Sequence, residues 1–149
     1  MHLLDIITII SAGLMTGTEL TVSTFVNPAL QRLESGPQAQ AVSILARSLG
    51  RAMPVWYSLC FTLLVLESFL RRHQPMLVPF LTATAIWAAA ILLSISVLVP
   101  INNRIIASLS AAAPAAGWER DQRKWELLHR VRILLLIIAL LVFINALVA

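Results

Sequence analysis

The sequence predicts an all-α integral membrane protein, an antiparallel four-helix bundle with a short interfacial helix in its first loop. Of its 149 residues, 59% are hydrophobic and only 12% are charged, whereas soluble domains carry roughly 25% charged residues. Four apolar stretches, residues 3–26, 53–70, 76–99 and 131–148, come close to the length of about 20 residues that a helix needs to cross a bilayer. Their apolar character is continuous and does not alternate, which favours helices over the strands of a barrel.

The first stretch is predicted to be a retained transmembrane helix and not a secretion signal. Secretion signals begin with a basic region, whereas Met1, His2 and Asp5 bring no Lys or Arg to the start of this stretch. Gly13 and Gly17 form a GxxxG pair, a spacing that lets two membrane helices approach closely. Packing is therefore their expected role, and a homodimer joined through such small-residue faces stays open.

The loops predict how the four helices are connected. In the first loop, Val42, Leu45 and Leu49 share one helical face, which predicts a short helix on the membrane interface. The turn RRHQP is long enough only for a helical hairpin, and the sequence SAAAPAAG predicts a broken connection in the last loop. Residues 118–130 are then expected to continue as a helix into the last span. No loop is long enough for a second domain, so residues 1–149 are predicted to form a single one.

The basic residues predict the orientation of the bundle. Nine of the eleven Lys and Arg residues lie in or beside the first and third loops, and only Arg71 and Arg72 lie in the second loop. An excess of Lys and Arg marks the cytoplasmic side, so we expect a bacterial inner-membrane protein with both termini outside. The same distribution argues against nucleic acid as a partner, although the net charge is +4. The single Cys60 excludes an intrachain disulfide and is expected to pack in the core.

Two acidic residues lie well within the apolar stretches, where an ionisable group is a functional candidate because its burial costs about 2.5–3.5 kcal/mol. Glu67 precedes Arg71 by four residues, the spacing of an ordinary helical ion pair, so no site is predicted there. Glu19 belongs to a polar stripe on one face of the first helix, which should point into the bundle. The members of this stripe are Thr8, Thr16, Glu19, Ser23 and Asn27.

Polar side chains at three predicted helix ends lie at a similar depth in the membrane. Trp125, His129 and Arg132 are spaced i, i+4 and i+7 along the last helix and therefore share one face. The first helix ends in FVNPAL and the third in VPINNRI, on the same side of the membrane. The candidate site that this convergence predicts consists of Glu19, Phe25, Asn102, Asn103, Trp125, His129 and Arg132.

A metal site is an alternative use of the same region. Glu126 and His129 form an E-x-x-H pair, but di-iron bundles need two such pairs and two further carboxylates. A mononuclear site of Glu19, Glu126 and His129 stays open, whereas His2 and His73 lie at the other side and cannot join it. No cofactor is predicted, and a bound metal or haem is the less favoured interpretation.

The quoted motifs resemble the DUF1772 family, which includes the fungal anthrone oxygenases. The resemblance spans essentially the whole chain and rests on the segments GTELTVSTFVNPAL, VPINNRI and WELLHRVR. The matching positions are Glu19, Phe25, Pro28, Pro100, Asn102, Asn103, Trp125, His129 and Arg132. The characterised members imply oxidation of a polycyclic anthrone to an anthraquinone by O2, without flavin or haem.

The resemblance also suggests roles for the candidate residues. His129 or Glu19 would take a proton from the anthrone carbon, which leaves an electron-rich anthrolate that can react with O2. Arg132 and Asn103 would stabilise the developing oxyanion. The substrate-binding residues, with the two aromatic rings packing on the flat substrate, would be Trp125, Phe25 and Asn102.

Two further functions stay open beside this predicted oxidoreductase. The same polar pocket would also suit a non-catalytic membrane binder of a lipid or small molecule, or an accessory subunit. The second further function is that of a metal-binding or haem-binding membrane protein. Transport has little support, because four helices without inverted repeats make a poor alternating-access machine. The expected partner is an apolar aromatic molecule or a lipid.

Overall fold

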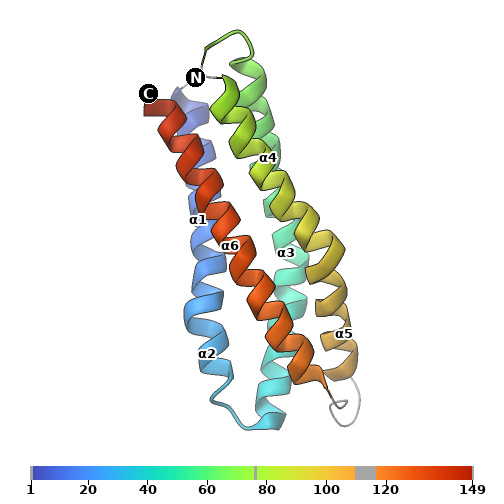
Figure 1. The fold of residues 1–149 in the computed structure, drawn as a ribbon. Helices are drawn as coiled ribbons and strands as arrows, with labels where there is room; N and C mark the ends of the chain where they lie inside the picture. The colour runs from blue at the N-terminus through green and yellow to red at the C-terminus, as the bar shows by residue number, and fades with distance from the viewer. Residues whose placement is uncertain (1, 76, 110–116, 149) are drawn as a thin grey trace.

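The structure, a computed structural model, describes residues 2–75, 77–109 and 117–148. Every regular element in this part of the chain is helical, and the elements form four long rods, each antiparallel to the next (Figure 1). In chain order the elements are α1 (His2–Thr21), η1 (Val22–Val26), α2 (Asn27–Leu30), α3 (Ser35–Leu70), α4 (Leu77–Leu93), η2 (Ser94–Leu98), α5 (Val99–Leu109) and α6 (Trp118–Val148). Because η1 and η2 are π-helical turns that continue their neighbours, α1–η1–α2 and α4–η2–α5 are one rod each.

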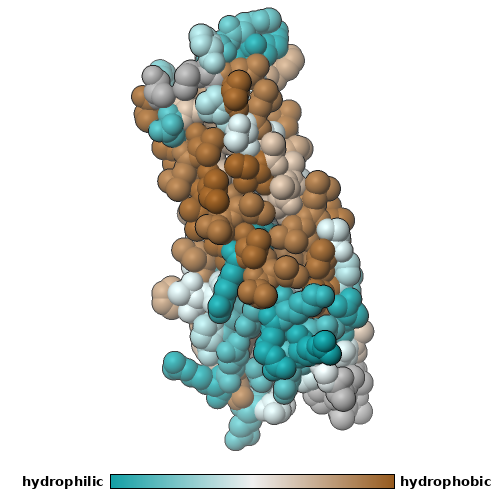
Figure 2. All heavy atoms as spheres, in the orientation of Figure 1, coloured by the Kyte–Doolittle hydropathy of each residue, from teal (hydrophilic) through white to brown (hydrophobic). Residues whose placement is uncertain are grey.

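All four rods are long and apolar enough to cross a membrane. Figure 2 shows an apolar band across the face in view, with hydrophilic side chains gathered towards both ends. The predicted all-α fold class, with four helices able to span a membrane, is therefore confirmed. The start of α1 and the end of α6 lie at the same end of the bundle (Figure 1), and the side of the membrane that this end faces stays a prediction.

The first loop differs from the prediction. Residues 42–49 do not form a separate interfacial helix, because they belong to the continuous 36-residue helix α3. Val42 on this segment is buried against Ile101 and Ile105 of α5. The apolar face that was expected to rest on lipid headgroups instead packs against the end of the third rod, and this burial favours an upright helix over one lying along the surface.

The other connections agree with the sequence. Residues 71–75 form the tight turn between α3 and α4, and α6 already begins at Trp118, as the expected helical continuation before the last span requires. Most of the predicted broken connection, residues 110–116 with Pro114, lies outside the described residues. Gly117 follows it with a φ of 95°, a conformation that glycine adopts without steric cost.

The larger apolar cluster of the core lies in the half of the bundle that holds the termini. Phe80 of α4 and Phe143 of α6 meet edge to face with ring centroids 5.5 Å apart, a favourable aromatic geometry. Cys60 is fully buried in this core, so its predicted packing role is confirmed. Towards the other half, the core gives way to the polar side chains described below.

Candidate functional site

A buried ion pair joins the first rod to the last. The Glu19 carboxylate, on a residue that is 3% exposed, accepts hydrogen bonds from Arg132 Nη2, at 2.8 Å to Oε2 and 3.0 Å to Oε1. Either charge alone would be costly in this setting, whereas the pair offsets much of that cost through its mutual attraction and hydrogen bonds. The helical spacing therefore predicted correctly that both side chains face the interior.

His129 is fully buried beside this ion pair. Its Nδ1 lies 2.9 Å from Arg132 Nη2 and 3.3 Å from Glu19 Oε2, and the Trp125 indole stacks on its ring with centroids 4.6 Å apart. A guanidinium only donates, so we assign Nδ1 as the acceptor and place the ring proton on Nε2. Within the described residues, Nε2 has no hydrogen-bond partner.

Two further side chains complete the cluster, and sequence reasoning missed both. The Tyr57 hydroxyl of α3 donates to Glu19 Oε1 at 3.0 Å, and the Arg132 guanidinium lies 5.3 Å from the Tyr57 ring centroid. Ser94, the first residue of η2, accepts from Arg132 Nη1 at 3.1 Å. Tyr57 could have been found as the one tyrosine of the chain, inside an apolar stretch, where its hydroxyl needs a partner.

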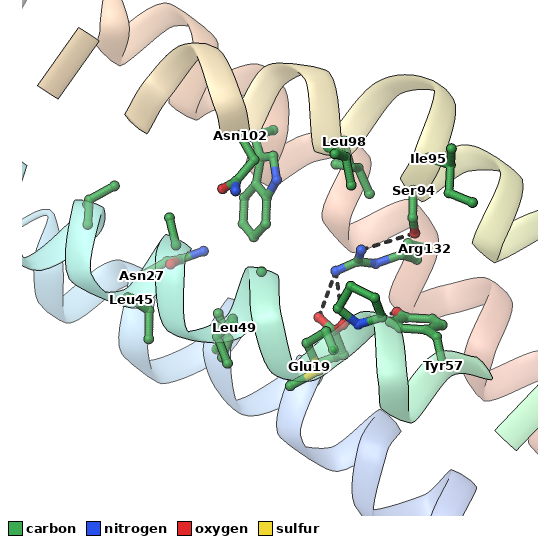
Figure 3. Close-up of a pocket in the computed structure, with 18 of the residues that line it drawn as sticks. Glu19, Asn27, Leu45, Leu49, Tyr57, Ser94, Ile95, Leu98, Asn102 and Arg132 are labelled. Carbon is green, nitrogen blue, oxygen red and sulfur yellow. Dashed lines mark hydrogen bonds and ion pairs between the residues drawn. The ribbon is translucent and has the colours of Figure 1, made fainter. Parts of the chain in front are cut away.

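The cluster borders a cavity of about 200 Å³ between the rods (Figure 3). Its polar residues at one end are Glu19, Tyr57, Ser94 and Arg132. The amides of Asn27 and Asn102 lie at the other end (Figure 3). The apolar side chains that line it include Leu45, Leu49, Met53, Leu98 and Trp125. An apolar cavity with a few convergent polar groups is the usual form of a small-molecule site.

Two π-helical turns border this cavity, one in the first rod and one in the third. The backbone N–H of Asn27 donates to Val22 O, and that of Val99 donates to Ser94 O, each five residues back. Pro28 and Pro100 follow directly, and a proline ring clashes with the carbonyl four residues earlier and lacks an N–H. A wider turn just before each proline relieves that clash, and such turns are frequent at functional sites.

The structure brings together most of the predicted site but not all of it. Glu19, His129 and Arg132 touch, and Trp125 and Asn102 line the cavity. Three predicted residues do not line it: His129, which is buried behind Arg132 and Trp125, and Phe25 and Asn103, which face away from the cluster. Phe25 is 69% exposed on the outer surface, and Asn103 is exposed as well. Residues one or two positions apart on a helix do not share a face, so Asn27 and Asn102 point inward where these neighbours point out.

The alternative metal triad is not assembled. The Glu126 carboxylate accepts hydrogen bonds from Gln31 Nε2 at 2.9 and 3.0 Å and from Gln122 at 3.4 Å. It therefore does not join Glu19 and His129, and the part of the chain that the structure describes contains no group of three or more His, Cys, Asp or Glu side chains placed to hold a metal ion.

Comparison with known proteins gives one match. The model of the family described as "Anthrone oxygenase" matches residues 40–142, which is more than half of the chain. The matched range contains Tyr57, Ser94, Trp125, His129 and Arg132, and it begins after Glu19. No curated protein and no solved structure matches the chain.

Proposed function

Because this chain belongs to the anthrone oxygenase family, we propose that it is a small membrane oxidoreductase that uses O2 to oxidise an apolar aromatic or quinone-like molecule. One observation carries the proposal: a carboxylate and a guanidinium, Glu19 and Arg132, line a cavity whose walls are mainly apolar. Such a cavity suits flat rings that pack against Trp125, while the ion pair supplies the groups that proton removal requires.

Of the two candidate bases, Glu19 is the one we assign. Glu19 lines the cavity, whereas His129 is fully buried and does not line it. His129 Nδ1 also faces an Arg132 N–H at 2.9 Å, so its lone pair is engaged. A general base must come within hydrogen-bond distance of the proton that it removes. We therefore give His129 a positioning role, in which it orients the Arg132 guanidinium.

Proton transfer to Glu19 would exchange one ion pair for another. The carbon acid loses a proton to the carboxylate, which becomes neutral, and the negative charge moves onto the substrate oxygen. Arg132 keeps its positive charge and can then stabilise that oxyanion. Because net charge in the site does not change, the step avoids creating an isolated charge in a setting of low dielectric constant.

The subsequent reaction with O2 balances without a further reductant. The substrate anion gives up electrons to O2 and forms a carbon–oxygen bond, and protonation by Glu19 yields a hydroperoxide. Loss of water from the hydroperoxide, with the remaining hydrogen of that carbon, leaves a carbonyl group. For an anthrone, one O2 is consumed and the products are one anthraquinone and one water.

The cavity is reached from the side of the bundle. Several residues that line it are also exposed, and they lie on α3 and on the η2–α5 segment of the third rod: Pro54, Ser58, Ile95 and Val99. Ile95 is 64% exposed, and an exposed apolar rim in a membrane-spanning segment contacts lipid tails. We infer that the substrate enters between α3 and η2 directly from the bilayer.

Replacing Ser58 with tryptophan should obstruct this entrance. A bulky side chain at the rim obstructs entry and exit alike, so both rate constants should fall and the Kd of anthraquinone should change less than either of them. Stopped-flow quenching of tryptophan fluorescence measures both rates. Leu59→Trp is the matched control, because Leu59 is 51% exposed on the same helix and does not line the cavity. Equal rates in the two variants would argue against the side entrance.

The proposed reaction is tested with purified protein in detergent and anthrone as substrate. We expect O2 uptake and anthraquinone formation in a ratio of one to one, measured with an oxygen electrode and by absorbance, at a rate above that of buffer. Non-reactive anthraquinone should inhibit the uptake by competing for the cavity. Binding of anthrone without O2 uptake would reject the catalytic proposal and favour a non-catalytic binder.

A further inference from the structure

The end of the cavity away from Glu19 carries a hydrogen-bond donor that the protein does not use. Asn27 is 5% exposed, and its Nδ2 has no hydrogen-bond partner in the described part of the chain. Figure 3 shows the amides of Asn27 and Asn102 directed into the space between the first and third rods. An unpaired buried amide costs about 1–3 kcal/mol. If Asn27 served only to pack the helices, the protein would be more stable with leucine at this position.

The other buried polar atoms without a partner are not available to bind a ligand in the cavity. They belong to Thr16, His129 and Arg132. Thr16 and His129 do not line the cavity, and the Arg132 guanidinium is already engaged by Glu19 and Ser94. Among these four side chains, Asn27 alone is an unengaged residue of the cavity wall, which singles it out as a ligand-binding group.

We propose that Asn27 Nδ2 donates a hydrogen bond to an oxygen atom on an outer ring of the substrate, a ring other than the one that reacts. This inference rests on the proposed function, because it specifies further which class of substrate the same cavity binds. The ligand would be a polycyclic aromatic that carries a phenolic hydroxyl or a carbonyl group at its far end. The neighbouring Asn102 amide can accept from a hydroxyl at that place, because an amide both donates and accepts.

The spacing along the first rod sets the length of this ligand. Asn27 lies eight residues after Glu19, which is about 12 Å along the axis of a regular α-helix and somewhat less here because the π-helical turn η1 lies between them. Apolar side chains line the space between them, including Leu49 and Leu98 (Figure 3). A single ring would be too short to reach both polar ends, whereas a linear fused-ring molecule with an oxygen on its outer ring is of the right extent.

The test compares two probes, anthraquinone and 2-hydroxyanthraquinone, by equilibrium quenching of tryptophan fluorescence in detergent. Wild-type protein should bind the hydroxylated probe about three- to tenfold more tightly, which corresponds to one net hydrogen bond. Asn27→Leu and the smaller change Asn27→Ala should bring this ratio close to one while largely preserving the affinity for anthraquinone. Asn103→Leu is the matched control, since Asn103 is exposed and does not line the cavity, and it should keep the wild-type ratio.

The outcomes separate this inference from the function on which it rests. A wild-type ratio near one, or a ratio that survives in both Asn27 variants, overturns the role of Asn27 and leaves the proposed reaction standing. If neither probe binds to the wild-type protein, the cavity is not an aromatic binding site, and both proposals fall. Far-ultraviolet circular dichroism of each variant establishes that its helices are intact before the ratio is interpreted.

Discussion

Replacing Glu19 with glutamine should reduce anthrone-dependent O2 uptake by about 10²–10⁴-fold, the range that loss of a general base typically produces. Glutamine has nearly the shape of glutamate, and a carbonyl oxygen at the place of Oε1 can still accept from the Tyr57 hydroxyl and from Arg132 Nη2, each of which lies 3.0 Å from that atom. The amide cannot take up a proton from carbon. The cavity should therefore keep its shape and its affinity for anthraquinone while turnover is lost.

The controls for Glu19→Gln use the other acidic and basic groups of the same region. Glu126→Gln makes the same chemical change on α6, where the carboxylate binds Gln31 and Gln122 and does not line the cavity, and it should leave the rate almost unchanged. His129→Gln should lower the rate less than Glu19→Gln does, because His129 acts only through Arg132. A fully active Glu19→Gln protein together with an inactive His129→Gln protein would reverse our assignment of the base.

The sequence predicted the four rods well because membrane insertion is decided by the composition of one segment at a time. A stretch such as residues 131–148 must be helical in lipid whatever its neighbours do. The face formed by Val42, Leu45 and Leu49 is a different case. Its periodicity shows that one side of the helix is apolar, but an apolar side can rest on lipid headgroups or on another helix. Only the position of Ile101 and Ile105 on α5 decides between them.

The same limit applies to the candidate site. Helical spacing placed Trp125, His129 and Arg132 on one face of the last helix. A charged side chain is costly to expose to lipid, so this face had to point inward, and its residues could be predicted. Tyr57 and Ser94 come from other rods, and their approach to Glu19 and Arg132 depends on how far each rod is rotated about its axis. That rotation is set by core packing and by the two π-helical turns, which short sequence motifs do not reveal.

A second buried charged cluster lies at the terminus end of the bundle, far from the cavity. Arg71, which is 4% exposed, contacts both the Glu67 carboxylate and Asp5 Oδ1, the latter at 2.5 Å. Thr8 donates to Glu67 Oε1 at 3.1 Å, and the Arg71 guanidinium lies 4.5 Å from the Phe80 ring centroid. Burial alone would lower the pKa of Arg71, but its two carboxylate partners outweigh that effect and raise it. One cation therefore ties α1 and the end of α3 together.

Replacing Arg71 with methionine should lower the free energy of unfolding by about 3–5 kcal/mol, the cost of removing one partner from a buried ion pair. Asp5 and Glu67 would be left close together without a cation. Unfolding in detergent by increasing fractions of SDS, followed by tryptophan fluorescence, measures the loss. The double variant Arg71→Met/Glu67→Gln should recover part of it, because the buried negative charge of Glu67 is then absent.

Arg72→Met is the matched control for Arg71→Met. Arg72 is the neighbouring residue, is exposed, and lies 4.3 Å from the ring centroid of Phe69 on the surface, where substitutions usually change stability by less than about 0.5 kcal/mol. Similar unfolding free energies for the two single variants would mean that the Asp5–Glu67–Arg71 cluster does not hold α1 against α3. The cluster contributes no residue to the cavity. The Arg71→Met protein that remains folded should therefore bind anthraquinone as tightly as wild type does. Stability of the bundle and ligand binding in the cavity thus depend on different buried ion pairs.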